Sequence, residues 1–473
     1  MSTYEIETMG CQMNERDSET IAGLLEQMGY TGATDYSLAD VIVVNTCSVR
    51  ENADNRFFGL LGHIKHVKLS RPDAIVAVCG CMMQQDYITE YIGDKHGWVD
   101  LIFGVHNIDA LPDMIEAVLR SRRISGDGEG SGNRPRTHKP ASFILPERVS
   151  LTEGLPVRRR FSFKASVNVM YGCNNFCTYC IVPYTRGRET SRDAADILAE
   201  VREAAVSGAK EFLLLGQNVN SYAGAGADTD AGAGAVVDFA DLISMVDDVP
   251  GVRRIRFMTS HPKDLSDKLI GSFRPADRGG VEHLCPSIHL PVQAGSTRVL
   301  ERMNRRYTKE EYIELVGKLR EARPDIAVTT DLIVGFPGET DDDFEDTMDI
   351  IERVRFDSAF TFLFSPRKGT PAAEYRDAVP DGIMHERFGR MVARLNAVTL
   401  EKNRALIGMV QEVLVEGTSK TNAAMLSGRT PHGKLISFPA PAGYGCTEGI
   451  IGNIIPVRIV SVNTFSFAGE AVG

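Results

Sequence analysis

Residues 171–184 read Tyr-Gly-Cys-Asn-Asn-Phe-Cys-Thr-Tyr-Cys-Ile-Val-Pro-Tyr, which spaces three cysteines as Cys173-x₃-Cys177-x₂-Cys180. Three thiolates in one short loop can bind three irons of a cubane iron–sulfur cluster, although such clusters normally take four cysteines. The fourth iron then has no protein ligand and is open to a small molecule. The motif therefore predicts a 4Fe-4S cluster with one open iron, to which a small molecule can bind.

A structural zinc site is the alternative for this loop, because Cys177 and Cys180 form a Cys-x₂-Cys pair of the kind that binds zinc. Such a site needs a second pair of ligands, and the sequence contains no other Cys-x₂-Cys and no His-x₃-His. The spacing therefore favours the cluster over zinc.

Apolar runs alternate with helical patterns on the carboxyl side of this loop. Six β/α repeats over residues 161–408 predict a partial (β/α)6 version of the (β/α)₈ barrel, whose sites lie at the carboxyl ends of the strands. The cysteine loop follows the first predicted strand, where that rule places the chemistry. We expect strands at 165–170, 211–215, 254–258, 287–292, 327–334 and 358–364, and helices at 194–207, 239–247, 265–273, 309–323, 342–353 and 385–407.

Residues 1–120 show the same alternation on a smaller scale. Continuous apolar strands separated by helices predict a parallel sheet covered on both faces, that is, a doubly wound α/β domain. We expect strands at 4–9, 41–45, 74–79 and 101–104, and helices near 14–28, 51–69, 84–92 and 108–119.

A second set of cysteines belongs to this first domain. Cys11, Cys47 and Cys81 each come just after a predicted parallel strand, and ligands collect outside the carboxyl ends of such strands. Three thiols at one edge of a sheet can hold another cluster with an open iron. The alternative is that each is a small buried residue, as cysteines often are. Cys79 competes with Cys81 for the third place, but it continues an apolar run and is expected inside the strand.

Three other segments differ in composition from these domains. Residues 121–160 are rich in glycine and charge and predict a linker, and from Arg120 to Arg160 ten basic residues stand against four acidic ones. Residues 223–235 alternate Ala and Gly and predict a flexible insertion. From residue 409 to residue 473, short β-type runs broken by Gly, Pro and Asn predict a small antiparallel β-barrel of a kind that often binds oligonucleotides.

The overall composition is that of a globular protein of about three domains, with 473 residues and 43% hydrophobic content. The net charge of −11 argues against coating by nucleic acid, although the basic residues of 120–160 can mark a phosphate contact. No apolar run reaches the length of a membrane span, and the first residues do not form a secretory signal. We therefore expect a cytoplasmic location.

Several motifs together resemble the methylthiotransferase family of radical S-adenosylmethionine enzymes, and they occur in order over nearly the whole chain. The runs Gly10-Cys-Gln-Met-Asn-Glu-Arg-Asp-Ser-Glu19, Asn45-Thr-Cys-Ser-Val-Arg-Glu51 and Gly80-Cys-Met-Met-Gln84 are similar to the family's N-terminal cluster motifs. The loop at 172–188 resembles its radical motif, and Leu215-Gly-Gln-Asn-Val-Asn220 and Asp331-Leu-Ile-Val-Gly-Phe-Pro-Gly-Glu-Thr340 fit its later strands. The final barrel is similar to a TRAM domain, an RNA-binding module.

The resemblance implies two 4Fe-4S clusters with different tasks. The cluster on Cys173, Cys177 and Cys180 would cleave S-adenosylmethionine to a radical that removes hydrogen from carbon 2 of a dimethylallyladenosine next to the anticodon of a tRNA. The cluster on Cys11, Cys47 and Cys81 would present sulfur that a second S-adenosylmethionine methylates. A radical is needed because an aromatic C–H bears no proton acidic enough for side-chain bases, so the cofactor carries the hard chemistry.

Positions next to the cysteine loop and at the strand ends supply further candidates. We predict cofactor contacts for Tyr179, Gln217, Asn218 and Gly335, although the glycine can equally serve a tight β/α turn. Residues after the loop can meet tRNA, where arginines and aromatic rings stack on unstacked bases. These are Tyr184, Arg186 and Arg188.

The expected partners are tRNA, a flavodoxin-like electron donor and a sulfur donor, and we expect a monomer. Two other functions stay open at this point. The same chemistry can act on threonylcarbamoyladenosine in tRNA or on an aspartate of a ribosomal protein. A function of another class is that of a non-catalytic iron–sulfur RNA-binding protein, which would not need an open iron.

Overall fold

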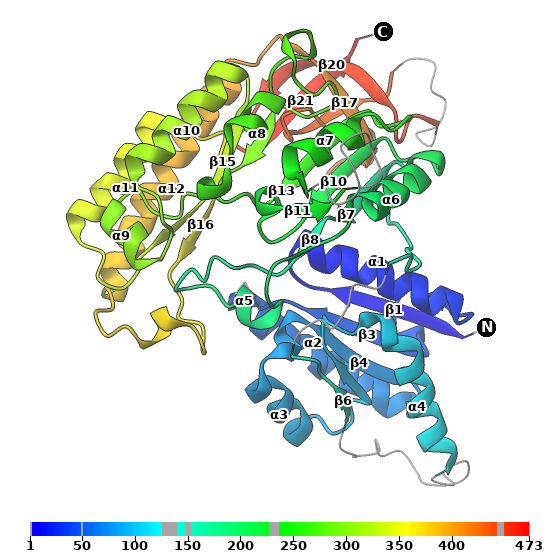
Figure 1. Ribbon diagram of the computed structural model, residues 1–473. Coiled ribbons are helices and arrows are strands. Elements are labelled where there is room, and N and C mark those ends of the chain that lie inside the picture. The colour runs from blue at the N-terminus through cyan, green and yellow to red at the C-terminus, as the bar shows by residue number, and fades with distance from the viewer. Residues whose placement is uncertain are drawn as a thin grey trace. The chain divides into compact units, whose positions relative to one another are not determined.

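The computed structural model describes residues 2–48, 51–124, 140–146, 153–226, 236–441 and 449–472. The chain forms two compact units. The first consists of residues 1–160, 170–176 and 180–192, and the second of residues 161–169, 177–179 and 193–473. Figure 1 labels many of the helices and strands of the two units.

The first unit contains a six-stranded parallel sheet in the order β2-β1-β3-β4-β5-β6. Its strands are β1 (Thr3–Thr8), β2 (Thr31–Gly32), β3 (Val41–Thr46), β4 (Ile75–Gly80), β5 (Leu101–Phe103) and β6 (Ala141–Phe143), and its helices are α1 (Gln12–Gln27), α2 (Glu51–Ser70), α3 (Asp86–Lys95) and α4 (Leu111–Ile124). The doubly wound α/β domain predicted from the sequence is confirmed.

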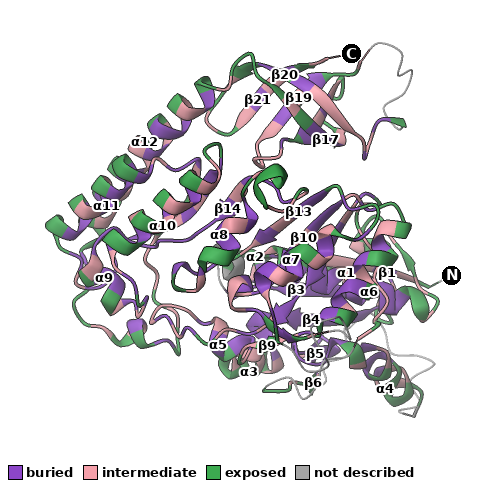
Figure 2. Cartoon of the chain, turned by 45° about the horizontal axis from the view of Figure 1, so that its top comes forward, coloured by how far each residue is buried: buried purple, intermediate pink, exposed green. Residues whose placement is uncertain are grey.

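Helices cover both faces of this sheet, and each face has its own hydrophobic core. Alternate residues of β4 point to opposite sides, so Ile75 packs with α1 and α4 while Val76 packs with α2 and α3. All six residues of β3 and of β4 are buried, as a parallel sheet between two helical layers requires. Figure 2 shows this burial along the central strands and exposure on the outer helices.

The predicted linker at 121–160 is wrong in one part, because residues 141–143 form β6 and pair in parallel with β5. The segment Ala141-Ser-Phe143 supplies one more strand to the edge of the sheet. α4 also continues to Ile124. Two arginines of the predicted linker form ion pairs: Arg122 pairs with Asp100, and Arg158 pairs with Glu26. Residues 125–139 and 147–152 lie outside the described residues.

A short antiparallel ribbon closes the cysteine loop at its base. β8 (Met170–Tyr171) pairs with β9 (Thr190–Ser191), and the four-residue helix α5 (Val182–Thr185) lies between them. Sequence periodicity cannot indicate this ribbon, because each strand is only two residues long. It fixes the two ends of the segment that carries Cys173 and Cys180.

The second unit begins with the predicted barrel of six parallel strands. One three-stranded piece has the order β13-β10-β7, and the other has the order β14-β15-β16. A parallel bridge between Ile255 and Leu284 joins the region of β13 to the segment that leads into β14. The strands are β7 (Lys164–Asn168), β10 (Glu211–Leu215), β13 (Arg254–Met258), β14 (Ser287–His289), β15 (Ala327–Val334) and β16 (Ser358–Leu363).

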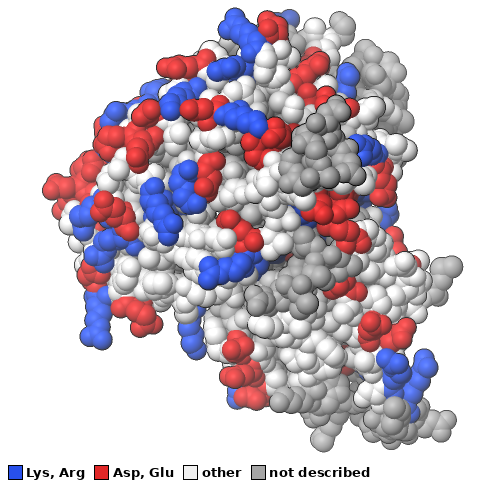
Figure 3. Space-filling model, viewed as in Figure 1, with Lys and Arg blue, Asp and Glu red and all other residues white. Residues whose placement is uncertain are grey.

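Helices separate these strands, as the sequence pattern predicts. They are α6 (Ala194–Val206), α7 (Phe239–Asp247), α8 (Asp267–Ser272), α9 (Thr297–Arg302), α10 (Lys309–Ala322), α11 (Asp341–Val354) and α12 (Asp381–Arg404). Acidic and basic side chains intermix on the outer helices (Figure 3), where Arg390 pairs with Glu345 and Arg394 pairs with Glu352. Exposed pairs of this kind contribute little to stability.

The Ala/Gly stretch predicted as a flexible insertion starts with a strand. β11 (Ala223–Ala225) pairs with β12 (Val236–Asp238) in an antiparallel hairpin. Small residues such as Ala and Gly can form this ladder because its hydrogen bonds come from the backbone. Residues 227–235 lie outside the described residues.

The carboxyl-terminal region forms a closed barrel in the order β17-β18-β19-β21-β20. Its strands are β17 (Val410–Thr418), β18 (Met425–Arg429), β19 (Leu435–Pro439), β20 (Ile454–Val462) and β21 (Ser466–Ala471). The prediction of a purely antiparallel barrel is wrong for one pair, because β19 and β21 run parallel. β20 pairs antiparallel with both β17 and β21, so β21 runs in the same direction as β19.

This barrel packs on the first strands of the second unit through buried charges. Arg254 donates to the carbonyl oxygens of Arg429 and Glu412, at 3.0 and 2.6 Å. Arg256 donates to the Thr430 carbonyl oxygen at 2.8 Å and pairs with Glu211 at 3.0 Å.

Among the described helices of the whole chain, none is long and apolar enough to cross a membrane.

Glu211 should therefore stabilise the second unit. Burial raises the pKa of Glu211, but Arg256, Lys164 and Arg254 outweigh burial and lower it from 4.5 to about 2. Because the folded-state pKa is depressed, this stabilisation is present above pH 4.5 and is lost as the pH falls toward about 2. We expect Glu211→Gln to cost about 3–5 kcal/mol at neutral pH, because it leaves buried cations uncompensated.

Denaturant unfolding of the wild type and the variant, at neutral pH and near pH 3, measures this difference. The gap between the two proteins should narrow at the lower pH. Glu412→Gln, at an exposed position nearby, is the control and should change the free energy of unfolding by less than about 0.5 kcal/mol. Equal effects of the two substitutions would contradict the role of Glu211.

Candidate iron–sulfur and cofactor site

Cys11, Cys47 and Cys81 all lie at the carboxyl ends of parallel strands in the first unit, as predicted. Cys11 precedes α1 as its N-cap, and Cys47 directly follows β3. Cys81 follows β4 and is the first residue of the 3₁₀ helix η2 (Cys81–Gln84), with 4% of its surface exposed. Cys79 lies inside β4 in the hydrophobic core, as its apolar run predicts.

Two glycines allow the loops that carry these cysteines to approach one another. Gly10 has φ +118°, and a Cβ atom there would lie 2.9 Å from the Cys47 sulfur. Gly80 has φ +99°, and its Cβ would lie 2.5 Å from the Thr46 nitrogen. Any larger residue would therefore push the Cys11 loop away from Cys47, or β4 away from β3.

A buried polar network lies beside the three cysteines. Asn14 donates to the carbonyl oxygens of Met9 and Thr46, at 2.8 and 2.7 Å. The side chain of Asn45 donates to the Asn14 carbonyl oxygen and to the Ser18 hydroxyl, both at 2.9 Å. These bonds join the loop after β1 to the end of β3. Both asparagines stand inside the quoted motifs, but the sequence did not distinguish them from their neighbours.

Arg186 is the main correction to the predicted site residues. We expected it to meet tRNA, but it is only 7% exposed. Its Nε donates to the Cys81 sulfur at 3.0 Å, and its Nη2 donates to Asn14 Oδ1 at 2.8 Å and to Asp17 at 2.7 Å. The physical reason is that a buried guanidinium needs a carboxylate and acceptors for its N–H groups, and this site supplies them.

The thiol of Cys81 is strongly perturbed by its surroundings. Burial raises its pKa to about 12; Arg186 lowers it, and the thiols of Cys11 and Cys47 raise it. Since metal ligands bind as thiolates, iron binding must remove this proton.

Within the described residues, no three His, Cys, Asp or Glu side chains are gathered as ligands of a single metal ion. A cubane cluster has a different requirement, because its three cysteines bind three different irons and stand farther apart than ligands of one ion. The donor set of Cys11, Cys47 and Cys81 fits such a cluster, because it offers three sulfurs in largely buried surroundings and the Arg186 guanidinium contacts one of them.

The loop with the second set of cysteines is divided between the units. Cys173 and Cys180 belong to the first unit and Cys177 to the second. The Cys173 amide donates to the Gly187 carbonyl oxygen at 3.1 Å, which holds the start of the loop against its end. The convergence of the three sulfurs on one cluster stays a prediction.

Cys177 has a buried arginine beside its sulfur, as Cys81 has. Arg305 is 5% exposed and donates to the Cys177 sulfur at 3.4 Å, to the Tyr307 hydroxyl at 2.8 Å and to the Pro291 carbonyl oxygen at 2.8 Å. Arg305 stands in a loop far from the motif in sequence, so the spacing of the cysteines could not reveal it.

The ends of β10 and β13 present polar atoms that no described residue satisfies. The side-chain amide of Asn218 donates to Asp264 at 2.8 Å, but its Oδ1 has no partner in the described part of the chain. The same holds for Ser260 Oγ and His261 Nε2. Buried polar atoms are nearly always hydrogen-bonded, so these three are suited to a bound polar ligand such as S-adenosylmethionine.

His261 is a neutral member of this group. Burial lowers its pKa to about 2, with the positive charge of Arg305 as the next cause, so the imidazole carries no charge at neutral pH. Its Nδ1 accepts from the Lys263 amide at 3.3 Å, which directs Nε2 elsewhere. The other two predicted cofactor contacts on this side of the unit, Gln217 and Tyr179, are both half-buried. Gln217 precedes Asn218 in the sequence, and Tyr179 lies two residues after Cys177.

Gly335 follows β15 with φ +79°, and the side chain of Met384 fills the space beside it. Its amide donates to Glu339 at 3.2 Å, and Glu339 pairs with Arg387 at 2.7 Å. These contacts explain the glycine by packing in a tight β/α turn. Cofactor contact at Gly335 stays a prediction.

Tyr184 and Arg188 remain exposed, unlike Arg186. The Arg188 guanidinium lies 4.5 Å from the centre of the Phe176 ring, and the Tyr184 ring lies 6.0 Å from that of Phe176. The exposed Tyr184 ring and Arg188 guanidinium, which flank the half-buried Phe176 ring, are suited to stacking on an unstacked base.

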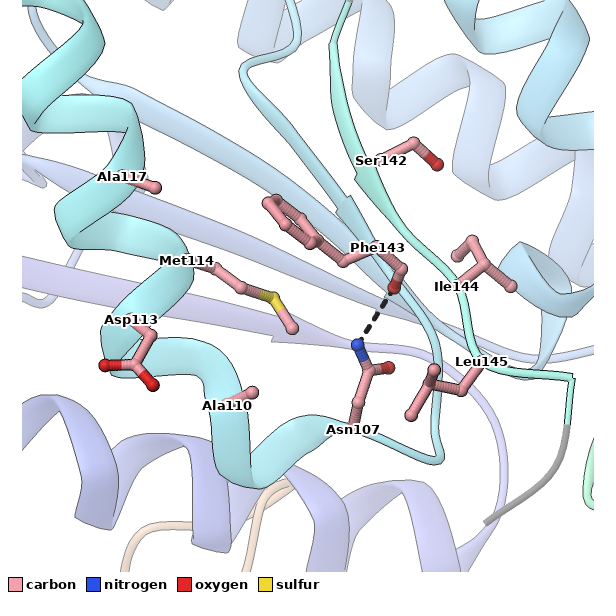
Figure 4. Close-up of a pocket in the computed structure, with 9 residues that line it drawn as sticks. All are labelled: Asn107, Ala110, Asp113, Met114, Ala117, Ser142, Phe143, Ile144 and Leu145. Carbon is pink, nitrogen blue, oxygen red and sulfur yellow. Dashed lines mark hydrogen bonds between the residues drawn. The ribbon is translucent and has the colours of Figure 1, made fainter. Parts of the chain in front are cut away.

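A separate pocket of about 450 Å³ lies between α4 and β6 (Figure 4). Asn107 donates to the Phe143 carbonyl oxygen at 3.0 Å beside it, and Met114 points toward Phe143. None of its nine lining residues is a cysteine, and Asp113 is the one ionisable residue among them. It therefore differs chemically from the cysteine site.

Comparison with known families matches three parts of the chain. Residues 3–104 match Uncharacterized protein family UPF0004, residues 167–351 match the Radical SAM superfamily and residues 404–472 match the TRAM domain. The superfamily uses a 4Fe-4S cluster and S-adenosylmethionine, so both belong to this enzyme. The count of two clusters rests on the cysteines alone.

Solved structures support the same fold. The radical S-adenosylmethionine methyltransferase TsrM from Kitasatospora setae superposes with a TM-score of 0.53 at 14% identity, covering 84% of this chain and 89% of that chain. At this identity the similarity shows the fold alone.

Two curated relatives match almost the whole chain, and both are named tRNA-2-methylthio-N(6)-dimethylallyladenosine synthase. The protein from Acetivibrio thermocellus is 48% identical over 99% of this chain and 91% of its own length. The protein from Alkaliphilus oremlandii is 46% identical over 99% of this chain and 92% of its own length. The chain therefore belongs to the family of tRNA-2-methylthio-N(6)-dimethylallyladenosine synthases, which are radical S-adenosylmethionine enzymes.

Proposed function

We propose that this enzyme replaces the hydrogen on carbon 2 of N6-dimethylallyladenosine in tRNA with a methylthio group. The observation that carries the proposal is the presence of two separate sets of three cysteines, each with a buried arginine against one sulfur. The names of the relatives supply the substrate. Since a methylthio group requires both C–H cleavage and a sulfur source, two cysteine sets fit this reaction better than one.

In this proposal Cys173, Cys177 and Cys180 hold the cluster that binds S-adenosylmethionine. When bound, that cluster and S-adenosylmethionine together supply a radical able to break an unactivated C–H bond. Arg305 offsets negative charge at the Cys177 sulfur from its buried position. The three cysteines occupy three irons and leave the fourth for the cofactor.

Cys11, Cys47 and Cys81 hold the second cluster, at the carboxyl edge of the first unit's sheet. Their role is to keep one iron free of protein ligands so that sulfur can be presented there. The buried polar network around Asn14 fixes the three loops relative to one another. A sulfur donor restores the sulfur after each turnover, and a flavodoxin-like protein supplies the electrons.

The polar atoms at the strand ends orient S-adenosylmethionine. Asn218 Oδ1, Ser260 Oγ and His261 Nε2 offer hydrogen-bonding groups without a partner among the described residues. Gln217, which precedes Asn218, and Tyr179, which lies two residues after Cys177, complete the cofactor contacts. A neutral His261 suits this role because it adds no charge against a cationic sulfonium.

The carboxyl-terminal TRAM barrel and the exposed pair Tyr184 and Arg188 bind the tRNA. The barrel belongs to a module class that recognises RNA, and Arg188 can stack on or pair with an exposed base. Arg186 takes no part in this contact because it is buried.

The decisive test is nucleoside mass spectrometry on tRNA that carries dimethylallyladenosine. The tRNA is incubated without oxygen with cluster-loaded protein, a reductant, S-adenosylmethionine and sulfide. We expect a methylthio mass gain on that nucleoside. If 5′-deoxyadenosine forms without this gain, the substrate is wrong, and threonylcarbamoyladenosine tRNA and the ribosomal protein are tested next. Absence of both products would favour a non-catalytic protein.

Two alanine variants test the separate roles of the cysteine sets. We expect Cys177→Ala to abolish 5′-deoxyadenosine formation, because the cluster that binds S-adenosylmethionine loses a ligand. Cys47→Ala should still form 5′-deoxyadenosine but no methylthio product. Liquid chromatography of the reaction measures both compounds. Equal loss of both activities in the two variants would refute the division of labour.

Gly10→Ala tests whether the Cys11 loop must approach Cys47. In a chain whose Cys173, Cys177 and Cys180 are replaced by Ala, iron analysis should find roughly four irons per chain. Gly10→Ala should lower that content, because its Cβ overlaps the Cys47 sulfur. Gly29→Ala is the matched control: Gly29 also has a positive φ of +88° but no atom within 4 Å. A full iron content in the Gly10 variant would contradict the proposed ligand set.

A further inference from the structure

Arg186 is a buried cation that the reaction as described does not use. It lies six residues after Cys180 in the same segment of the first unit, next to the four-residue helix α5. Its guanidinium donates hydrogen bonds to the Cys81 sulfur, Asn14 and Asp17. Cys81 is one of the three cysteines of the first unit's site, and Asn14 and Asp17 lie in α1, the helix that follows Cys11.

The contacts are too specific for a side chain that is merely covered. Burying a guanidinium is costly unless it is paired and its N–H groups are hydrogen-bonded. Asp17 balances its charge at 2.7 Å and is itself 7% exposed. The Nε–H is then left for the Cys81 sulfur at 3.0 Å, close for a hydrogen bond to sulfur. Asn14 fixes the orientation of the Arg186 guanidinium. Its Oδ1 accepts from Arg186, and its Nδ2 donates to the carbonyl oxygens of Met9 and Thr46.

Such a contact has a known consequence for an iron–sulfur cluster. The reduction potential of a cluster depends on its net charge and on hydrogen bonds to its sulfur atoms. A guanidinium against a ligand sulfur supplies a positive charge and an N–H donor together, and both favour the reduced, more negative state. Burial strengthens the effect because little solvent screens the charge.

We propose that Arg186 is a positioning residue for the cluster on Cys11, Cys47 and Cys81, where it fixes the Cys81 sulfur and raises the reduction potential of that cluster. The inference rests on the proposed function, which assigns a cluster to these three cysteines. Arg305 stands in the same relation to Cys177, so each set of cysteines has its own arginine.

The test uses the full-length chain with Cys173, Cys177 and Cys180 replaced by Ala, so that one cluster alone is observed. Its midpoint potential is measured by electron paramagnetic resonance during a redox titration, and iron is counted per chain. Arg186→Gln removes the charge, and Arg186→Lys keeps it. We expect the potential to become more negative in Arg186→Gln and to return part of the way in Arg186→Lys.

A matched control comes from the same segment. Arg192 is 5% exposed and pairs with Glu153 at 2.5 Å, so Arg192→Gln removes an equally buried arginine away from Arg186's contacts with Cys81. Its cluster potential should equal that of the parent. Because Arg186→Gln leaves Asp17 unpaired and can unfold the site, the double variant Asp17→Asn with Arg186→Met removes both charges together. It should fold and show a negative shift that is smaller than in Arg186→Gln, because the lost Asp17 carboxylate offsets the lost positive charge and the missing hydrogen bond to the Cys81 sulfur remains.

The outcomes separate this inference from the proposed function. If the parent chain binds no cluster, the ligand assignment itself is wrong and the role of Arg186 is refuted with it. If the parent binds a cluster and the Arg186 variants keep its potential and its spectrum, the proposed function stands and the inference is overturned. A shift in the Arg192 variant as large as that in the Arg186 variants would also overturn it.

Discussion

Parallel strand pairing is the constraint on which the site of the first unit depends. Cys11, Cys47 and Cys81 are separated by tens of residues, and no local element could bring them together. In a parallel sheet all carboxyl ends lie at one edge, and the register pairs Thr46 with Gly80, the two residues that precede Cys47 and Cys81. The sheet is therefore the device that converts distant cysteines into neighbours, and its two hydrophobic cores stabilise the site.

Charge is the second constraint, because sulfur ligands carry negative charge into a buried region. Asp17 alone would add to that charge, whereas Arg186 balances it and still reaches Cys81. The second unit solves the same problem with Arg305 at Cys177. A buried charge without a partner is costly, so a pair of this kind is required wherever a thiolate is enclosed.

The sequence predicted the fold well where periodicity was strong, and three barrel strands, including β10 and β15, have the predicted bounds. It missed β6, which stands beyond a glycine-rich segment, and the ribbon of β8 and β9, whose strands are too short to show a period. Spacing and position select the six candidate cysteines. Cys81 is preferred to Cys79 because Gly80 ends the strand that contains Cys79. It misjudged Arg186, because a charged residue in a loop is usually exposed and only the tertiary fold reveals its partners.

One segment of the first unit serves both sets of cysteines. Residues 180–192 carry Cys180 at their start and Arg186 six positions later, and α5 and β9 fix the path between them. Because Arg186 is held by Asn14 and Asp17, Cys180 is tied to the loop that carries Cys11. The hydrogen bonds of Arg186 to Asn14 and Asp17 therefore hold the segment that carries Cys180 against α1, the helix that follows Cys11. Within this unit, the support of Cys81 thus comes in part from the segment that also carries Cys180.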